Sequence, residues 1–598
     1  MLLLLLLRPH AIKVIASETI KVRRRGSMLA TARTASNAAL GTFTVPRLTR
    51  ARSLLASLDQ GTSSSRVILY DAASLAPVAS HQVELQSATT TPQPGWSQMD
   101  PMAILSTIDQ SAAGALEKAG ATAKDVVGIG ITNQRESTIV WDRRTGEPLY
   151  DAVLWHDART SETSAALQTE LGGQDALRSV CGLPISTYFT GVKLRWLQDN
   201  VPAVREGLEN GTALVGTVDS WLLWNLTGGA KGVGSTTRHL TDVTNASRTM
   251  MMDLQSGSWH EPSIAALGLQ GAAGALPDIV SCAEALGTVA NGGALHGAPL
   301  TGCIGDQQSA MVGQRCFGRG EAKITYGTGA FLLMNAGTTA TPSTHGLLST
   351  ALYQFGPSGE LHYALEGAVA CCAVGINWFR DSLGMYAKAA DVSALAAQAS
   401  SGTEGLYFVS AFGGLLAPHW REDARGTLVG LTLAHDRRHV ARAVLEGIAF
   451  QATDVVQAMV QDTGASLVAL RVDGGVSMSS ELLQYQADLL DVRVERPSDV
   501  ETTAAGAAIA AGLGAGVWKD VSEVPPPGAL GGGATFAPMS DGVVMPRTHT
   551  PHAFPLASSP HASSPRAHYP LVTSATVICA RRPPTPHCPW RCVTLDLN

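Results

Sequence analysis

The sequence predicts an α/β protein in which layered sheets are flanked by helices. Strand-like runs such as VVGIGIT (126–132), STIVWD (137–142) and ALRVDGG (469–475) alternate with longer stretches of helical pattern at 100–120 and 437–464. This alternation is typical of sheets covered by helices. At 598 residues the chain is too long for one core and indicates two to four domains.

The first predicted element is a β-hairpin at residues 53–71, SLLASLDQGTSSSRVILYD, in which two apolar runs flank a turn that contains glycine. Thr62, Ser63 and Ser64 give the turn hydroxyls and unhindered N–H groups, which suit an anion such as phosphate. Asp59 lies at the end of the first run, where a carboxylate could hold a metal ion. An ordinary polar hairpin turn explains this stretch alone equally well.

The strand predicted at 126–132 is followed by the residues NQRE. Arg135 and Glu136 would therefore leave the end of that strand together. An Arg beside a Glu supplies a fork of donors and a pair of acceptors, which suits a small polyol. Taken alone, the two residues are better explained as a surface ion pair, because exposed pairs are common and contribute little.

Asp306 lies between APLTGCIG and QQSAMVGQ, at a junction of strand and helix where aspartate is favoured as an N-cap. The run TYGTGAFLLM at 325–334 then echoes the first hairpin, again with a turn of small residues between two strands. Two such halves, each with a phosphate turn, would form a nucleotide clamp, and a duplicated structural hairpin is the alternative. The sequence has neither a GxxxxGK[ST] nor a GxGxxG motif.

Composition excludes several classes of function. The net charge of −6, from 43 basic and 49 acidic residues, argues against a nucleic-acid-binding surface. The nine cysteines show no regular framework and no CxxC pair, which is typical of buried thiols in a reducing compartment. No apolar run approaches the roughly 20 residues that a transmembrane segment needs.

The two ends of the chain differ from the middle. Residues 1–58 carry ten Lys and Arg but one acid, Glu18, and are rich in Ala, Ser and Thr, which is typical of an organellar transit peptide. Such a peptide would direct the protein to a mitochondrion or plastid; a true start at Met28 and a cytoplasmic protein are the alternative. The Pro-, His- and Ser-rich segment 521–598 has no hydrophobic period and is predicted to be disordered.

Many short motifs, in order, resemble those of the FGGY carbohydrate kinase family, most clearly its members that act on glycerol. The resemblance runs from about Leu54 to Trp518 and includes LDQGTSSSR, PGWSQMDP, GIGITNQRESTIVWD, TGVKLRWLQDN, GTVDSWLLW, TDVTNASRTM, GDQQSAMVGQ, TYGTGAF, ALEGAV, LRVDGG and VERP. It implies two actin-like, ribonuclease-H-like ATPase domains with a cleft between them, at 54–315 and 316–520, after an extension at 1–53.

The resemblance also implies an activity, which is the transfer of phosphate from ATP to glycerol, giving sn-glycerol 3-phosphate, with Mg²⁺. Such an enzyme serves glycerol uptake and catabolism or supplies glycerolipid precursors. Asp306 would be the general base, and Asp59 and Asp306 would hold the metal. The implied substrate residues are Arg135, Glu136, Tyr188, Asp306, Gln307, Trp155 and Phe331. The implied nucleotide residues are Thr62, Ser63, Ser64, Arg66, Thr328, Gly329, Ala373, Asn377, Gly475 and Ser479.

Three of these positions depart from the family pattern. Family members often have Gly at the position of Ala373, Gln or Arg at that of Asn377, and Asn at that of Ser479, so the affinity for ATP is less certain than the type of reaction. Two rival functions stay open: a sugar or polyol kinase that acts on a ketopentose or tetritol, and a non-catalytic actin-like ATP-binding protein. Family members often form dimers or tetramers, which leaves a homodimer or homotetramer open here.

Overall fold

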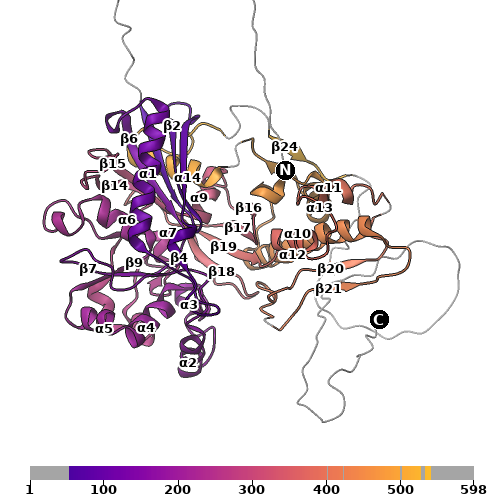
Figure 1. Ribbon diagram of the computed structural model, residues 1–598, viewed down its shortest axis with the longest axis horizontal. Coiled ribbons are helices and arrows are strands. Elements are labelled where there is room, and N and C mark those ends of the chain that lie inside the picture. The colour runs from indigo at the N-terminus through magenta and orange to yellow at the C-terminus, as the bar shows by residue number, and fades with distance from the viewer. Residues whose placement is uncertain (1–52, 401, 422, 499–500, 527–532, 540–598) are drawn as a thin grey trace, which may run out of the picture. The chain divides into compact units, whose positions relative to one another are not determined.

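The computed structural model describes residues 53–539, apart from 401, 422, 499–500 and 527–532. It confirms the predicted α/β class, since helices cover two large sheets (Figure 1). Residues 1–52 and 540–598 lie outside the described residues, so the transit peptide and the end of the tail stay predictions. All six described cysteines are free and buried, as predicted.

The first sheet combines an antiparallel hairpin with two parallel neighbours. Its strands in spatial order are β14 (Ala283–Thr288), β15 (Pro299–Gly305), β6 (Val126–Asn133), β1 (Leu54–Gln60), β2 (Ser64–Asp71) and β3 (Pro77–Glu84). The hairpin predicted at 53–71 is β1–β2. Strands β1, β6 and β15 are parallel, with Gln60 opposite Asn133 and Asn133 opposite Gly305. Their carboxyl ends therefore meet at one edge of the sheet.

Helices cover both faces of this sheet. Leu54, Ala56 and Leu58 of β1 pack in the core beneath α1 (Pro101–Ala119), whereas Leu55 packs in the core that contains α14 (Thr502–Gly514). Helix α1 begins after Asp100, whose carboxylate accepts from the N–H of Met102 at 2.8 Å. Because both faces are covered, β1, β6 and β15 are buried along most of their length.

Helix α14 comes late in the sequence but packs on the first sheet and on α9 (Asp306–Gly313). In Figure 1 it is the orange helix among the indigo and purple elements. A Cβ atom on Gly506 of α14 would lie 1.8 Å from the carbonyl oxygen of Ser309, and one on Gly313 would lie 1.9 Å from that of Thr502. The two helices thus approach backbone to backbone, and the predicted 316–520 domain contributes a helix to the first half.

The second sheet repeats the arrangement of the first. Its strands in spatial order are β18 (Leu348–Tyr353), β19 (His362–Val369), β17 (Ala330–Gly337), β16 (Glu321–Tyr326), β22 (Ala469–Asp473), β23 (Val494–Arg496) and β24 (Ala534–Phe536). The hairpin predicted at 325–334 is β16–β17, and β16 is parallel to β22 just as β1 is to β6. The predicted internal duplication is therefore confirmed in the strand pairing, and the nucleotide clamp stays a prediction.

Strand β24 corrects one expectation, because it lies in the segment 521–598 that was predicted to be disordered. It pairs with β23, and Phe536 packs against the hydrophobic core beside the second sheet, which we call the second core. The sheet edge supplies the hydrogen bonds and the core supplies the apolar contact, neither of which the local composition reveals.

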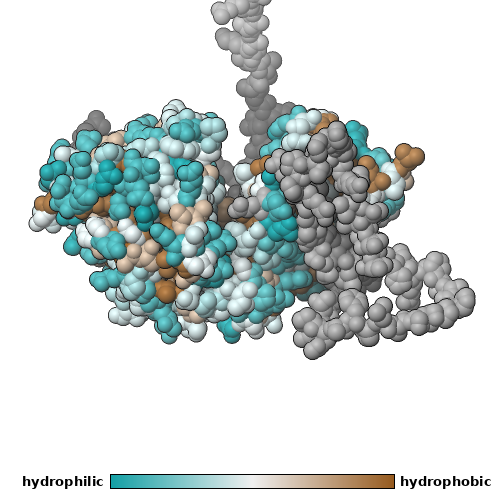
Figure 2. Space-filling model, turned by 90° about the horizontal axis from the view of Figure 1, so that it is seen from below, coloured by the Kyte–Doolittle hydropathy of each residue, from teal (hydrophilic) through white to brown (hydrophobic). Residues whose placement is uncertain are grey.

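Residues of α10 (Ala373–Asp381), α12 (Arg437–Thr463) and α13 (Ser480–Leu490) pack in the same hydrophobic core as the second sheet. Helix α12 is the one described helix that is long and apolar enough to cross a membrane, but most of that stretch is buried in the second core. We interpret it as a core helix. The face in Figure 2 is mostly hydrophilic, with apolar residues in small groups, as on most folded domains.

The remaining elements form small sheets and helices around the two large ones. The further strands are β4 (Thr89–Thr90), β5 (Gln98–Met99), β7 (Ile139–Asp142), β8 (Ala152–Val153), β9 (Ala213–Gly216), β10 (Leu240–Asp242), β11 (Met252–Asp253), β12 (Ser258–Trp259), β13 (Asp278–Val280), β20 (Tyr407–Val409) and β21 (Thr427–Val429). The further helices are α2 (Ser161–Leu171), α3 (Arg178–Cys181), α4 (Thr190–Asn200), α5 (Pro202–Glu209), α6 (Val218–Leu226), α7 (Val243–Ala246), α8 (Glu261–Ala266) and α11 (Asp391–Ala396).

Tryptophan side chains of β7 and α6 pack against one another, and the imidazole of His239 packs against this group. The imidazole of His239 lies edge-on to Trp141 with ring centroids 5.3 Å apart, and its Nε2 is 3.0 Å from the carbonyl oxygen of Val215. Burial lowers the pKa of His239 to about 4 from 6.5. The folded protein therefore keeps this imidazole neutral under conditions in which an unfolded chain would protonate it.

We expect His239 to make the protein less stable in mild acid. As the pH falls from 6.5 towards 4, the unfolded chain binds a proton at His239 that the folded protein does not, so the free energy of unfolding decreases. The loss should be about 2 kcal/mol by about pH 4.5. Denaturant unfolding of the wild type and of His239→Gln at about pH 7 and pH 4.5 checks this. Equal losses in the two proteins would contradict it.

Candidate active site

The carboxyl ends of β1, β6 and β15 bring three distant stretches to one edge of the first sheet. Asp59 is the next-to-last residue of β1, Arg135 and Glu136 come just after β6, and Asp306 comes directly after β15. In open α/β sheets, ligands bind outside this edge. The structure therefore places the predicted base, polyol pair and metal ligand at the same end of neighbouring strands.

Arg135 joins Asp306 to the second sheet. Its Nε lies 3.1 Å from Oδ1 of Asp306, and its Nη1 and Nη2 donate to the two carboxylate oxygens of Glu366, on β19, at 2.6 and 3.0 Å. The Arg135 side chain is 2% exposed and that of Asp306 is 30% exposed. Asp306 is the first residue of α9 rather than its N-cap, which is Gly305. Its carboxylate is thus both anchored and accessible.

Glu136 belongs to the same network of buried charges. Nε of Arg248 donates to Oε1 of Glu136 at 2.5 Å, and Nη2 of Arg248 donates to Glu366 at 3.2 Å. Burial raises the pKa of Glu136, although Arg248 and Arg135 oppose the rise. Burial also acts to raise the pKa of Glu366, but Arg135 and Arg248 outweigh it and hold that pKa at about 2. Arg135 and Glu136 are therefore not a surface ion pair, which was the alternative interpretation: each belongs to a buried network of four charges and is paired with a residue from elsewhere in the chain.

Two guanidinium donors of this network lack a hydrogen-bond partner within the described part of the chain. They are Nε of Arg135, which is near Asp306 but not aligned for a hydrogen bond, and Nη1 of Arg248. The backbone of Glu136 is also in the left-handed region, with φ of 62°. Buried unpaired donors and a strained backbone are both costly and are concentrated at ligand sites.

Three aromatic side chains line this region. The ring of Trp155 lies 5.6 Å from that of Tyr188 and 6.2 Å from that of Phe331, each edge to face. Phe331 is on β17 of the second sheet, whereas Trp155 and Tyr188 come from the turns after β8 and before α4. Lys193 donates to the carbonyl oxygens of Thr187 and Tyr188, which fixes the backbone before α4. Burial raises the pKa of Tyr188, so its hydroxyl stays a donor.

Gln307 lies beside a lysine that the sequence did not single out. Lys323 on β16 is fully buried and donates to the side chains of Gln307 and, at 2.8 Å, of Thr325. Burial lowers the pKa of Lys323, and the carboxylates of Asp473 and Asp306 oppose that change. A cation from the second sheet therefore contacts the residue that follows the predicted base.

The turn between β1 and β2, which is predicted to bind phosphate, has hydrogen-bond donors without partners. The backbone N–H groups of Thr62 and Ser63, and the hydroxyls of Ser63 and Ser64, have no hydrogen-bond partner among residues 53–539 with the gaps given above. Oγ1 of Thr62 accepts from Nε1 of Trp155 at 2.9 Å, which ties the turn to the aromatic group. Arg66, the predicted phosphate cation, instead pairs with Glu501 and donates to Gln82 at 2.7 Å.

The second turn lies against the start of α10. The carbonyl of Gly327 accepts from the N–H of Ala373 at 3.1 Å, and that of Thr328 accepts from the N–H of Cys372 at 3.0 Å. Asn377 lies one helical turn after Ala373 and is therefore on the same side of α10. A Cβ on Gly329 would lie 2.7 Å from the carbonyl oxygen of Val369, so this turn needs glycine there.

The last two residues predicted to bind the nucleotide, Gly475 and Ser479, follow β22. Gly475 is exposed, and a Cβ there would meet nothing within 4 Å. The residue before it, Gly474, has φ of 84° and passes close to the carbonyl oxygen of Tyr326 at the end of β16. The hydroxyl of Ser479 accepts from the N–H of Leu482 at 3.2 Å as the N-cap of α13. These positions lie at the carboxyl edge of the second sheet, but no described hydrogen bond joins them to the first turn.

The donor set fits a divalent cation. Asp59 and Asp306 are carboxylates at the ends of β1 and β15, the two strands on either side of β6, and carboxylate oxygens suit Mg²⁺. Burial raises the pKa of Asp59 to about 7, and Asp306 and Glu501 add to this rise while Arg66 opposes it. A cation at this edge would offset the repulsion between the carboxylates.

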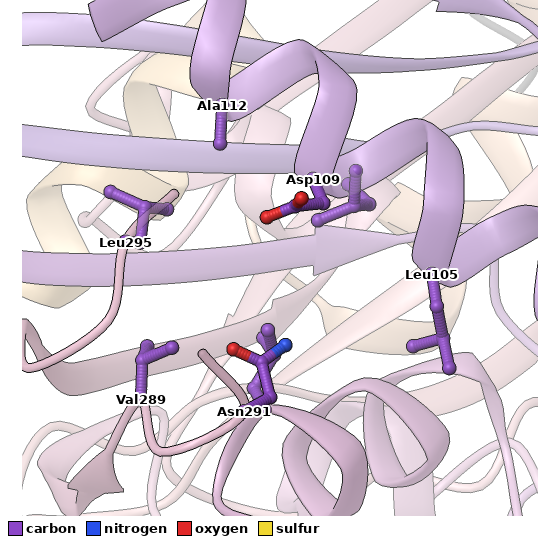
Figure 3. A pocket seen from close by; sticks show the side chains of 8 residues that line it. Leu105, Asp109, Ala112, Val289, Asn291 and Leu295 are labelled. Carbon is purple, nitrogen blue, oxygen red and sulfur yellow. The ribbon is translucent and has the colours of Figure 1, made fainter. Parts of the chain in front are cut away.

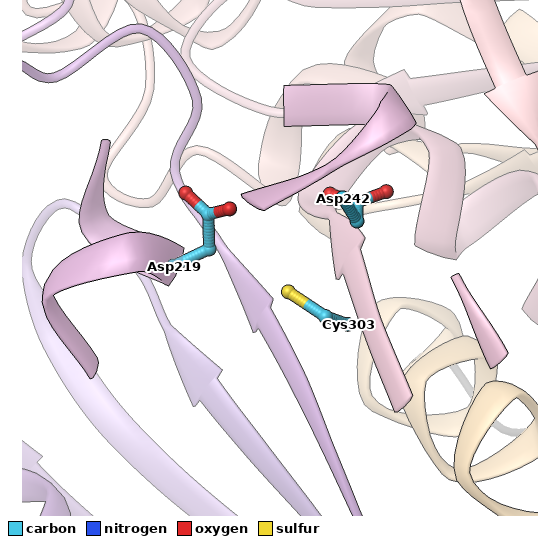
Figure 4. A group of neighbouring side chains, drawn as sticks. All are labelled: Asp219, Asp242 and Cys303. Atoms are coloured by element: carbon cyan, nitrogen blue, oxygen red, sulfur yellow. The ribbon is translucent and has the colours of Figure 1, made fainter. Parts of the chain in front are cut away.

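Asp219, Asp242 and Cys303 form a second cluster of potential ligand atoms (Figure 4). Both carboxylates are already engaged: Asp242 accepts from the N–H groups of Thr244 and Asn245 as the N-cap of α7, and Asp219 accepts from Thr241 at 2.7 Å. We interpret the cluster as structural: its hydrogen bonds hold α7 in place, and Arg248 follows shortly after that helix.

A small cavity of about 20 Å³ lies between α1 and the loop that follows β14 (Figure 3). Its size suits about one water molecule. Asp109 on its rim accepts from the N–H of Ala294 at 2.8 Å, and none of the predicted site residues lines it. The cavity is therefore not part of the candidate active site.

Sequence reasoning missed Arg248, Lys323 and Glu366 as site residues, although each lies in or beside a quoted motif. A signal was present in two of them. Lys323 and Glu366 are charges inside largely apolar strands, EAKITY and HYALEGAV, and charges at such positions are buried only when they are paired. Their partners, however, come from distant parts of the chain.

Comparisons with known proteins show which family the chain belongs to. Two family models match, the N-terminal domain of the FGGY family of carbohydrate kinases over residues 54–313 and the C-terminal domain over residues 322–515. The chain is 48% identical over 479 residues to a glycerol kinase of Arabidopsis thaliana, covering 78% of this chain and 90% of that protein. It is 47% identical over 470 residues to a glycerol kinase of Brucella anthropi, covering 79% of this chain and 92% of that protein.

Solved structures show the same fold. The crystal structure of Plasmodium falciparum glycerol kinase with ADP matches with a TM-score of 0.74 and 34% identity, covering 81% of this chain and 94% of that one. A xylulose kinase from Rhodospirillum rubrum matches with a TM-score of 0.69 and 24% identity, with the same coverage, and shows the fold alone. The chain therefore belongs to the FGGY family of carbohydrate kinases and has that family's two actin-like ATPase domains.

Proposed function

We propose that the protein transfers the γ-phosphate of ATP to a terminal hydroxyl of glycerol, giving sn-glycerol 3-phosphate and ADP. The observation that carries this proposal is the buried network of Arg135, Glu136, Arg248 and Glu366. Two of its guanidinium donors are unpaired, and one of them, Nε of Arg135, lies beside Asp306. Donors and acceptors held this closely suit a small polyol. The aromatic rings of Trp155 and Phe331 suit its carbon chain.

Asp306 is the general base in this proposal. Its carboxylate accepts the proton of the terminal hydroxyl while that oxygen attacks the γ-phosphorus in line, and the bond to the β–γ bridging oxygen breaks to release ADP. Arg135 holds Asp306 from one side and offers Nε to a substrate oxygen. The contact of Lys323 with Gln307 holds the start of α9 against the second sheet.

Asp59 and Asp306 would hold Mg²⁺, with water completing its shell. When bound, the ion supplies positive charge that offsets the phosphates of ATP. The turns at 61–64 and 327–329 would bind the phosphates through their unpaired N–H groups and hydroxyls. Because Arg66 is paired with Glu501, binding of ATP by Arg66 would require it to exchange partners.

The test is release of ADP by the full-length protein with Mg·ATP, with and without glycerol. We expect release that depends on glycerol, together with formation of glycerol 3-phosphate. A panel that includes a ketopentose and a tetritol separates glycerol from related substrates. Release that is independent of glycerol, or a clear preference for another polyol, would overturn the proposal.

A further inference from the structure

We propose that Glu366 is a positioning residue that selects which edge of Arg135 faces the substrate. This inference rests on the proposed function, since it concerns how the polyol hydroxyls are held. Glu366 comes from β19 in the second sheet, whereas Arg135 follows β6 in the first. The orientation of the substrate arginine is therefore set from the opposite half of the protein.

The count of donors on Arg135 shows how the selection works. A guanidinium has five N–H groups. Nη1 uses its two on Glu366 and Gln308, at 2.6 and 3.2 Å, and Nη2 uses one on Glu366 at 3.0 Å. The hydrogens left over are one on Nε and one on Nη2, which form a single fork on the side of Asp306. Glu366 thus occupies the end of the guanidinium and leaves its side edge for a ligand.

Glu366 also holds the second arginine of the network. Its Oε1 accepts from Nη2 of Arg135 at 3.0 Å and from Nη2 of Arg248 at 3.2 Å. Arg248 in turn holds Glu136. One carboxylate therefore sets the relative position of the two guanidinium groups whose unpaired donors, Nε of Arg135 and Nη1 of Arg248, are free for hydroxyls.

The backbone that carries Glu366 is well placed for this task. Glu366 lies in the middle of β19 and is paired with Leu333 of β17 on one side and Leu348 of β18 on the other. A site residue on a central strand is held more precisely than one on a loop. The side chain is 2% exposed, so solvent does not compete for its hydrogen bonds.

The experiment replaces the carboxylate of Glu366 by an amide of nearly the same shape. Glu366→Gln loses the charge and one acceptor, so the end of Arg135 is free to turn towards Asp306. We expect the KM for glycerol to rise at least tenfold and kcat/KM for glycerol to fall about 10²-fold, because small misplacements of binding groups are costly. The KM for ATP should change by less than about threefold, since no described contact joins Glu366 to the phosphate turns.

Two further variants separate positioning from general damage to the fold. Glu321→Gln removes the same charge from another ion pair of the second sheet, with Arg471 at 3.0 Å, and should keep the wild-type KM for glycerol. Glu366→Asp keeps a carboxylate and should recover part of the loss; it also serves as the test if Glu366→Gln does not fold. An unchanged KM for glycerol in the folded variant, or an equal rise in both KM values, would overturn the proposal.

Failure of the proposed function would look different. It would appear in the wild type, as turnover without dependence on glycerol, before any variant is compared. The KM comparison is then made with whichever polyol the wild type phosphorylates, and the same two outcomes decide the role of Glu366.

Discussion

Asp306→Asn is expected to lower kcat with glycerol by about 10²- to 10⁴-fold, the usual loss for a general base. Asparagine keeps the size of the side chain and can still accept from the N–H of Gln307, as Asp306 does at 2.7 Å. It cannot take up the proton of the hydroxyl, and it loses the charge beside Nε of Arg135. Release of ADP at saturating Mg·ATP and glycerol measures the effect.

The matched control is Asp454→Asn. Asp454 is 48% exposed and pairs with His419 at 3.2 Å, away from the described site residues. An exposed pair contributes little to stability, so this variant should keep its activity and its melting temperature. If Asp306→Asn were folded and turned over glycerol at a rate close to that of the wild type, Asp306 would not be the base.

Gly506→Ala is expected to destabilise the folded protein by about 3 kcal/mol or more, because α9 and α14 cross without room for a side chain. The added Cβ would lie 1.8 Å from the carbonyl oxygen of Ser309, and backbone cannot move aside as a flexible side chain can. Ser309 is one helical turn from Asp306 on the same short helix. A shift of α9 would therefore lower activity as well as stability.

Denaturant or thermal unfolding of Gly506→Ala and of Gly271→Ala provides the comparison. A Cβ on Gly271 would meet nothing within 4 Å, so that substitution should change the free energy of unfolding by less than about 1 kcal/mol. A Gly506→Ala protein as stable as the wild type would show that the two helices do not cross as closely as described here.

Much of the fold could be predicted from local pattern. The hairpin at 53–71, the strands at 126–132 and 469–475 and the long helix at 437–464 all form within one or two residues of their predicted ends, and the hairpin predicted at 325–334 extends further, over residues 321–337. Each combines a hydrophobic period with a turn or cap residue, such as Asp100 or Gly464, so propensity and burial agree. Strand β24 was missed because a sheet edge, and not its own sequence, stabilises it.

The candidate site was predictable only in part. Asp59, Arg135, Glu136 and Asp306 lie at or just after strand ends, a position that sequence shows, and the resemblance supplied their roles. Glu366 and Lys323 lie inside strands, where the role of a charged residue can be inferred only once its partner is known. Those partners, Arg135 and Gln307, are 231 and 16 residues away in the chain.

The sequence by itself determined the α/β class, the two glycine-containing turns and the family, because these depend on order and spacing along the chain. Only the tertiary structure decided which residues share a hydrogen bond. It placed Arg135 and Glu136 in a buried network of four charges, paired Arg66 with Glu501, and placed α14 on the first sheet. The physical reason is that buried charges and close backbone contacts are satisfied between segments far apart in sequence, where local pattern carries no information.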